Sequence, residues 1–451
     1  MTGAVSSGAF AAREAARRIF LAGLEAADPA GAVRRALEAG PGASATVAGE
    51  RFARPGSLRV VAVGKAAAAM ARACLEVLPE GLAAGPALAV AHDEGAAAVP
   101  GCRLLSAGHP LPDERGARAA LEVESLVSRA GPEEALILLL SGGASALLPA
   151  PAPGISLEDK AAATRRLLIA GADIGDLNAV RKHLSRLKGG RLAEKAAPAA
   201  VEALIVSDVI GDDVSTIGSG PTAPDPTTYA DALEALSRRG VLEEVPAAVR
   251  RFLERGRRGE VPETPKPGSP VFRRVRNRVV AGSATSLERA RAEAERLGLR
   301  AEIVSRALSG EAREAGAGFA RRAAERLRAD GPLALLAAGE TTVTVKGSGL
   351  GGRNQELALA FALEAERLGL AGPWAFLSAG TDGRDGPTDA AGAVVDPGTL
   401  ERGRRAGADP EAALAENDSY RFFERSGDLF RTGPTGTNVA DLQVLVAAPA
   451  A

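Results

Sequence analysis

Short apolar runs alternate with longer segments of helical periodicity along most of the chain. The aliphatic runs occupy residues 59–64, 87–91, 136–140 and 201–206. Segments with apolar residues at helical spacing, of which 66–78 is the clearest, separate these runs. This alternation is typical of a parallel sheet covered by helices on both faces. We therefore predict an α/β protein whose first domain is a Rossmann-like, doubly wound, largely parallel sheet.

The best domain boundary is the stretch 257–270, which is rich in proline, glycine and charged residues. A second α/β cycle starts at Arg276 and runs to the end of the chain. We predict an N-terminal domain over 1–260, a C-terminal α/β domain over 271–451, and a linker at 257–270. Residues 11–39 are Ala-rich with apolar positions at helical spacing, so they predict an opening helical segment.

The charge balance excludes some classes of partner. The 451 residues include 55 basic and 56 acidic side chains, with a formal net charge of -1. This balance argues against a nucleic acid or an acidic membrane held by bulk charge. The N-terminus has no basic region before an apolar core, and the chain has no uninterrupted apolar stretch of about 18 residues. Neither export nor a membrane span is therefore predicted.

The cysteines and histidines limit which disulfides and metal sites the chain can form. Cys74 and Cys102 are the only cysteines, too few for a disulfide framework, which favours a reducing cytoplasm. The histidines at 92, 109 and 183 show no metal-ligand spacing with them, so a zinc site is not expected.

Candidate chemistry lies where the predicted strands end, because ligands of open α/β sheets gather beyond the carboxyl ends of strands. Lys65 follows the first aliphatic run directly and is one of only seven lysines in the chain. Its ammonium could neutralise a phosphate oxygen during transfer. The alternative is a solvated lysine at a helix start, although it would oppose the helix dipole there. The turn is not a Walker A motif.

Two further segments suggest anion binding. Ser141, Gly142 and Gly143 follow the run 136–140, where a Gly-Gly turn can hold a phosphate or carboxylate but also serves as a plain tight turn. In 178–191, read as a helix, three side chains lie together beside an apolar stripe formed by Val180, Leu184 and Leu187. These three are Arg181, Ser185 and Lys188. A solvated helix face explains them as readily as an anion site does.

An acidic loop follows the run 201–206. It contains Asp208 and leads to the segment 218–222, which includes Ser219, Gly220 and Thr222. Carboxylates at a strand end can hold magnesium directly or through water, or can form turns. The density of acids and glycines exceeds what one turn requires, and this favours the metal interpretation.

The most informative pattern lies between Gly339 and Asp389. A strand-like run, 333–346, leads through the glycine-rich 347–352 into a helix, and a second run ends at the acidic loop 381–389. Glycines let backbone N–H groups approach an anion, and a helix N-terminus adds partial positive charge. The three aspartates of the acidic loop offer the oxygen ligands that magnesium prefers. Together they indicate phosphoryl transfer from a magnesium nucleotide.

At these residues the sequence resembles the class II glycerate kinases, also called the glycerate 2-kinase or MOFRL family. Ten segments match in order, which is far more specific than any single one. They are 61–67, 107–113, 140–147, 183–192, 207–213, 219–222, 351–358, 380–383 with 385–392, 417–420 and 432–438.

The resemblance implies ATP- and Mg²⁺-dependent phosphorylation of D-glycerate at its 2-hydroxyl, which gives 2-phosphoglycerate and ADP. It also implies two α/β domains with the active site in the cleft between them. The small-molecule substrate is the implied partner, with neither nucleic acid nor membrane, and a homo-oligomer is left open.

The family's catalytic positions correspond to Lys65, Arg353 and Asp382. The first two would offset charge on the transferring phosphoryl group, and Asp382 would bind magnesium or orient the glycerate hydroxyl. The expected metal ligands are Asp208, Asp382 and Asp385. The residues expected to bind glycerate or ATP are Ser141, Gly142, Gly143, Arg181, Lys188, Ser219, Gly220, Thr222, Glu340, Asn354, Thr437 and Asn438.

Two other functions compete with this prediction. A hydroxypyruvate reductase would carry Gly-x-Gly-x-x-Gly after the first strand, whereas the first turn here is Gly64-Lys65 followed by four alanines. The loop 347–352 has a related spacing but stands in the second domain. A non-catalytic sugar-acid sensor is the other alternative. Paired acidic and cationic loops favour catalysis, and an activity assay decides between them.

Overall fold

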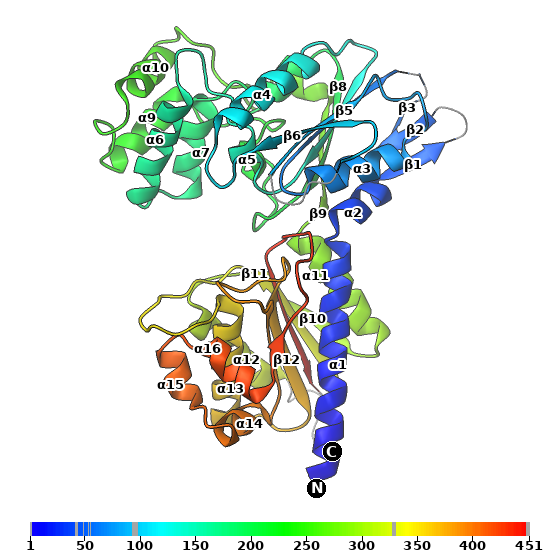
Figure 1. Ribbon diagram of the computed structural model, residues 1–451, viewed down its shortest axis with the longest axis vertical. Helices are drawn as coiled ribbons and strands as arrows, with labels where there is room; N and C mark the ends of the chain where they lie inside the picture. Colours follow the sequence, from blue (N-terminus) through cyan, green and yellow to red (C-terminus); the bar gives the residue numbers. More distant parts are fainter. Residues whose placement is uncertain are drawn as a thin grey trace. The chain divides into compact units, whose positions relative to one another are not determined.

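The computed structural model describes residues 2–40, 44–47, 49–52, 54, 56–92, 98–326 and 331–447 (Figure 1). The chain forms two compact units. We call Pro29–Ser207 with Asp213–Val280 the parallel-sheet unit. We call Met1–Asp28, Asp208–Asp212 and Ala281–Ala451 the mixed-sheet unit.

The parallel-sheet unit is built on six strands in the order β6-β5-β4-β7-β8-β9. Their bounds are β4 Leu58–Val63, β5 Ala87–His92, β6 Cys102–Ala107, β7 Ala135–Leu140, β8 Ala200–Val206 and β9 Val275–Ala281. All pairs from β6 through to β8 are parallel. Every residue of β7 is buried, as expected when helices cover both faces of a parallel sheet. The predicted α/β class and parallel sheet are confirmed.

Helices pack on this sheet and beside it. Those against the sheet are α3 Ala67–Val77, α4 Glu114–Val127 and α8 Arg191–Ala196. A second group shares its own apolar core and comprises α6 Leu157–Ile169, α7 Ile174–His183, α9 Tyr229–Arg238 and α10 Ala247–Arg257. The unit also contains α2 Pro29–Ala36, α5 Ala144–Leu147, the 3₁₀ turns Ile217–Ser219 and Pro270–Arg274, and a small sheet of β1 Leu37–Gly40, β2 Ser44–Val47 and β3 Glu50–Phe52.

The mixed-sheet unit has the strand order β10-β11-β15-β12-β13-β14. Their bounds are β10 Arg300–Leu308, β11 Leu333–Gly339, β12 Trp374–Gly380, β13 Gly392–Val395, β14 Leu429–Phe430 and β15 Asp441–Ala447. The last strand, β15, lies antiparallel between β11 and β12. The helices are α1 Thr2–Ala26, α11 Ser283–Arg296, α12 Ala312–Arg326, α13 Arg353–Arg367, α14 Thr399–Arg405, α15 Pro410–Ala415 and α16 Ser419–Ser426.

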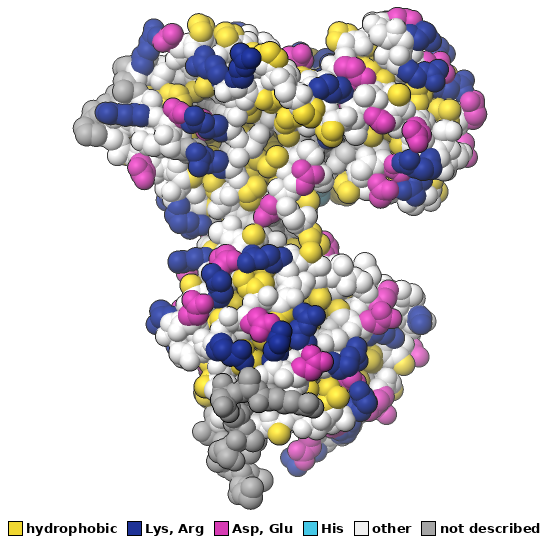
Figure 2. Space-filling model, turned by 180° about the vertical axis from the view of Figure 1, so that it is seen from behind, with side chains coloured by type: hydrophobic (Ala, Val, Ile, Leu, Met, Phe, Trp, Pro, Cys, Tyr) yellow, Lys and Arg dark blue, Asp and Glu magenta, His cyan; other side chains and the backbone are white. Residues whose placement is uncertain are grey.

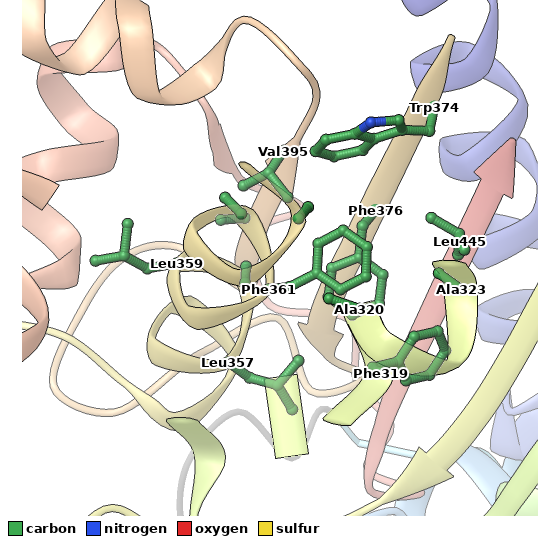
Figure 3. Close-up of a cluster of buried hydrophobic side chains, with 14 of the residues drawn as sticks. Phe319, Ala320, Ala323, Leu357, Leu359, Phe361, Trp374, Phe376, Val395 and Leu445 are labelled. Carbon is green, nitrogen blue, oxygen red and sulfur yellow. The ribbon is translucent and has the colours of Figure 1, made fainter. Parts of the chain in front are cut away.

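Alternate residues of β12 enter different cores of this unit. Phe376 stacks on Phe361 of α13 with ring centroids 4.1 Å apart, and Trp374 and Phe319 complete the aromatic cluster in Figure 3. Leu377 enters the other core, with α1 and α11. The two-residue period of a strand thus covers both sheet faces with apolar contacts.

The predicted domains and the observed units differ in membership. Residues 257–270, the predicted linker, pack within the parallel-sheet unit, where the Glu263 carboxylate accepts a hydrogen bond from the Tyr229 backbone N–H at 2.9 Å. Strand β9, expected to open the second domain, is an edge strand of the first sheet. Composition marks 257–270 as irregular backbone, but it does not tell an anchored loop from a free linker.

Two expected elements are shorter in the structure. The opening helical segment, 11–39, is split into α1 and α2 and gives way to β1 at Leu37. The run 333–346 is a strand only as far as Gly339. Beyond it Thr342 makes an isolated bridge to Glu311, so the alternating Thr and Val residues there have no full partner strand.

No helix in the described part of the chain combines the length and the apolarity needed to span a bilayer. On the face shown in Figure 2, basic and acidic side chains are interspersed.

Candidate functional site

Lys65 stands at the carboxyl edge of the parallel sheet, between β4 and α3. Its backbone N–H donates to Gly142 O at 2.9 Å, and the next N–H, of Ala66, donates to Ser141 Oγ at 3.1 Å. These two hydrogen bonds connect the end of β4 to the end of β7. The Lys65 side chain is exposed and has no hydrogen-bond or ion-pair partner within the described residues. Its ammonium is free to meet an anionic ligand.

His109, which the sequence analysis did not select as a site residue, lies over the same turn. A Cβ at Gly143 would fall 3.1 Å from His109 Nε2 and 3.3 Å from Lys65 Cγ, and Gly143 has φ +84°. Only glycine fits this conformation and this space. Burial, followed by the charges of Lys65 and His92, lowers the pKa of His109. Burial and the neighbouring charges therefore favour the neutral imidazole. The sequence signal that could have identified His109 as a site residue is its position in the matched segment 107–113.

A cavity of about 270 Å³ extends from this turn between α6 and α7. It brings together Gly143, Arg181 and Lys188, three of the residues predicted to bind glycerate or ATP. Lys188 is buried, so the solvated-face interpretation of this side chain is wrong. The reason is that α7 ends at His183, so Lys188 does not continue the exposed face of a helix. Lys160 of α6 also lines the cavity, and its ordinary amphipathic helix gave no signal.

Ser219, Gly220 and Thr222 hold a loop of the parallel-sheet unit. Ser219 Oγ donates to Asn178 Oδ1 at 3.0 Å, and Thr222 Oγ1 donates to Asn277 of β9. Both side chains are buried. Their hydroxyl groups are engaged by protein partners, and their binding roles stay predictions.

Arg353 opens α13 in the mixed-sheet unit and is held by two carboxylates. Its Nε and Nη2 reach the two oxygens of Asp441 at 2.6 and 2.9 Å, and Nη1 lies 2.9 Å from Glu340 Oε1. Burial alone would lower the pKa of Arg353, but Asp441 and Glu340 raise it above its ordinary value. Asp441, almost fully buried, was not predicted as a site residue, because its partner lies 88 positions away.

Asp385 caps the N-terminus of α13. Its two oxygens accept the backbone N–H groups of Asn354 at 3.1 Å and Gln355 at 2.9 Å. Burial, opposed by these hydrogen bonds, raises its pKa to about 6. The expectation that this helix N-terminus cradles a ligand anion is therefore corrected, because the chain's own carboxylate occupies it. Asn354, through Oδ1, also accepts a hydrogen bond from Ser378 Oγ at 2.7 Å.

The glycine-rich loop 347–352 packs against the segment that precedes α16. A Cβ at Gly347 or Gly349 would collide with Glu416. Asn417 Oδ1 accepts the N–H groups of Lys346 and Gly347, at 2.8 and 3.1 Å. Because these glycines have no side chains, the segment around Glu416 can pack closely against the loop. Protein atoms therefore occupy the space beside the loop.

Asp382 is an exposed acid of the second acidic loop and, unlike the exposed Asp389, pairs with no described cation. Its Oδ1 accepts the Arg384 N–H at 3.0 Å. A Cβ at Gly380 would lie 3.0 Å from Asp382 Oδ1 and 3.5 Å from Asp441 Oδ1. Asp382 thus stands beside the Arg353–Asp441 pair. Among the described residues, no group of three or more His, Cys, Asp or Glu side chains is arranged to hold a metal ion.

The remaining predicted residues lie in the mixed-sheet unit. Thr437 Oγ1 donates to Ala27 O at 2.7 Å, and Asn438 Oδ1 accepts the Ala440 N–H at 3.2 Å. Asp208 follows β8 and is partly exposed.

The predicted residues therefore fall into two groups. Lys65, Ser141, Gly142, Gly143, Arg181, Lys188, Ser219, Gly220 and Thr222 belong to the parallel-sheet unit, and Asp208, Glu340, Arg353, Asn354, Asp382, Asp385, Thr437 and Asn438 belong to the mixed-sheet unit. That both groups act on one substrate in an interdomain cleft stays a prediction.

Comparison with known proteins identifies the class. The chain matches the family models "Domain of unknown function (DUF4147)" over residues 15–254 and "MOFRL family" over residues 333–441. The glycerate 2-kinase of Pyrococcus horikoshii is 40% identical over 439 residues, which covers 96% of this chain and 97% of that protein. A protein of Agrobacterium vitis named a putative hydroxypyruvate reductase is 42% identical over 443 residues, which covers 96% and 94%.

A solved structure agrees. The crystal structure of glycerate kinase from Thermotoga maritima superposes with a TM-score of 0.85 at 38% identity, and the match covers 97% of this chain and 99% of that one. The fold, the charged strand ends and these relatives place the chain among the α/β phosphotransferases. It belongs to the glycerate 2-kinase family.

Proposed function

We propose that this protein transfers the γ-phosphoryl group of ATP to the 2-hydroxyl of D-glycerate, giving 2-phosphoglycerate and ADP. The observation that carries the proposal is Lys65, which is exposed at the carboxyl edge of the parallel sheet and has no partner among the described residues. It stands in a chain related over nearly its full length to glycerate 2-kinases. A free ammonium at a strand end can offset the charge that develops on a transferring phosphoryl group.

Three residues carry the proposed chemistry. The glycerate oxygen bonds to the γ-phosphorus as the bond to the bridging oxygen of ADP breaks, and ADP leaves with that electron pair. Lys65 and Arg353 stabilise the negative charge on the phosphoryl oxygens. Asp441 and Glu340 fix the guanidinium of Arg353. Asp382 would orient the glycerate hydroxyl or take its proton.

Magnesium would accompany the nucleotide and offset the charge of its phosphates. Mg²⁺ commonly uses one or two carboxylates together with substrate phosphates. Asp382 fits this requirement, because it is exposed and has no cationic partner in the part of the chain that the structure describes. Asp208, partly exposed at the end of β8, is the second predicted ligand. Asp385 fits less well, because both its oxygens already accept N–H groups of α13.

The reductase alternative has less support. Gly347 and Gly349 pack against Glu416, so their backbone does not offer the close approach to a pyrophosphate that a nicotinamide fingerprint needs. The turn after β4 lacks the fingerprint altogether.

One assay tests the proposal. ATP, Mg²⁺ and D-glycerate are incubated with the enzyme, and the products are resolved as 2- or 3-phosphoglycerate. We expect 2-phosphoglycerate with stoichiometric ADP. In a parallel reaction with hydroxypyruvate and NADH or NADPH we expect no oxidation of the cofactor. Reduction without phosphorylation would overturn the kinase assignment, and binding of glycerate with neither reaction would indicate a sensor.

We also propose a cytoplasmic location, which is supported by two cysteines that form no disulfide. A homo-oligomer stays open.

A further inference from the structure

The cavity of the parallel-sheet unit has a cationic interior and an apolar rim. Lys160, Arg181 and Lys188 line it from α6, α7 and the segment after α7. Leu111 and Leu168 line it as well and are among the most exposed large apolar side chains of the protein. Among the described residues, no Asp or Glu contributes to its wall. A site with this lining suits a small anion.

Within the described part of the chain, the two buried lysines have only neutral partners. Lys160 Nζ donates to Pro149 O at 2.7 Å and Leu184 O at 3.1 Å. Lys188 Nζ donates to Ser145 O at 2.9 Å and Leu148 O at 3.0 Å. An ammonium has three N–H donors, so each lysine keeps one donor for a further acceptor. The hydrogen bonds of these amines hold them in place without neutralising their charge.

Arg181 lies beside them without a counter-ion. The structure shows no hydrogen bond or ion pair of its guanidinium within the described residues. Its sequence neighbours Lys182 and Arg186 differ in this respect, because Lys182 pairs with Asp225 and Arg186 pairs with Glu124. Arg181 and Lys188 are thus the cations of this segment that lack a carboxylate partner among the described residues.

Clustering of buried cations without carboxylates is costly, since buried charges are ordinarily paired. This cost favours the neutral amine forms of the two lysines. Burial, with the charge of Arg181, lowers the pKa of Lys188 to about 7. Burial, with the charges of Lys188 and Arg181, also lowers the pKa of Lys160 well below its usual value. Among the described residues, the titratable groups that line the cavity with Lys188 are all basic: Arg181, Lys160, Arg165 and His109. Arg186 also lowers the pKa of Lys160.

We propose that this cavity binds one carboxylate or phosphate group between Arg181 and Lys188, and that binding takes up a proton. An anion supplies the missing counter-charge and restores the ammonium of Lys188. The volume of about 270 Å³ lies just below the range of about 300–1,000 Å³ for drug-sized ligands. It therefore suits a small acid or the phosphate end of a nucleotide. Only the identity of the ligand rests on the proposed function, because D-glycerate and ATP both carry such a group.

Calorimetric titration of the full-length protein tests this. D-Glycerate, inorganic phosphate and ADP are each titrated at pH 8 in two buffers of different ionisation enthalpy. We expect at least one ligand to bind with uptake of up to about one proton, since Lys188 is mostly neutral at that pH before binding. If only D-glycerate binds, the cavity is a carboxylate site. If ADP and inorganic phosphate bind, it is a phosphate site.

Matched variants locate the binding. Arg181→Met and Lys188→Met should each weaken binding about tenfold or more, and Lys188→Met should also abolish the proton uptake. Arg166→Met and Lys195→Met, whose native side chains pair with Glu244 and Glu124 outside the cavity, should change neither. If Lys188→Met does not fold, the half-buried Arg181 decides the question.

The proposal is overturned if none of the three ligands binds, or if each binds Arg181→Met as tightly as the native protein. If binding is unchanged in Arg181→Met and the protein has kinase activity, the proposal of an anion site in this cavity is wrong and the proposed function stands. If the variants weaken binding but the native protein has no kinase activity, the cavity site stands and the proposed function is overturned.

Discussion

At the residue scale, Lys65 is distinguished because no described residue pairs with its exposed ammonium. Replacing it with alanine removes one electrostatic contact to the transferring phosphoryl group, so kcat should fall by about 100-fold or more. The thermal unfolding midpoint should stay close to the native value, because the exposed side chain holds nothing in place. Steady-state kinetics and thermal denaturation of Lys65→Ala check both points. Near-native turnover would reduce Lys65 to a solvated residue at a helix start.

The acids of the loop 381–389 are predicted to differ in function. Asp382 is exposed beside the Arg353–Asp441 pair, whereas Asp389 accepts a hydrogen bond from Tyr420 OH at 2.8 Å and pairs with Arg431. Asp382→Asn should therefore lower kcat and weaken its dependence on Mg²⁺, and Asp389→Asn should do so much less. Initial rates over a range of Mg²⁺ concentrations make the comparison. A larger effect at Asp389 would move the metal or base assignment along the loop.

The depressed pKa of Lys188 predicts a pH dependence of stability. Between about pH 7 and pH 10 the unfolded chain holds a proton on this lysine that the folded chain has released. The contribution of Lys188 to the free energy of unfolding therefore rises with pH in this window, by up to about 1.4 kcal/mol per pH unit. Lys188→Met should lose that rise. Unfolding of both proteins at pH 7, 8 and 9 tests this, and parallel curves would contradict it.

At the scale of elements, the N-terminus of α13 depends on Asp385. Asp385→Ala leaves two backbone N–H groups without their acceptor, so the free energy of unfolding should fall by about 1–2 kcal/mol. Denaturant unfolding of the variant measures this. Asp382→Ala is the matched control, because that exposed carboxylate accepts only the Arg384 N–H of its own loop. Unchanged stability with lost Mg²⁺ dependence in Asp385→Ala would instead return Asp385 to the metal site.

At the scale of the whole molecule, the N-terminal helix completes the mixed-sheet unit. Phe20 is fully buried, with its ring centroid 5.2 Å from that of Phe430, whereas Phe10 on the same helix is 67% exposed. Phe20→Ala should destabilise this unit by about 3–5 kcal/mol, and Phe10→Ala by less than about 0.5 kcal/mol. Hydrogen exchange in β12 and β15 would report the loss. Equal effects of both variants would show that α1 does not belong to this core.

Sequence alone determined the features that depend on near neighbours. Short aliphatic runs between segments of helical period located β4, β7 and β8, and the turn after β4 put Lys65 at a strand end. The matched motifs were sufficient for the family, because ten segments in one order are read without knowing what they touch.

Tertiary structure decided what each charged or glycine residue meets. The partners of Arg353 and Asn354 lie 88 and 31 positions away, and no local period encodes such pairings. For that reason the glycine-rich loop and the start of α13 resembled an anion cradle, although protein atoms fill both. For the same reason Lys188 resembled a solvated side chain, although it is buried beside Lys160. Residue type and spacing indicate which groups can bind a ligand. Only the folded structure shows whether other residues of the protein already occupy those groups.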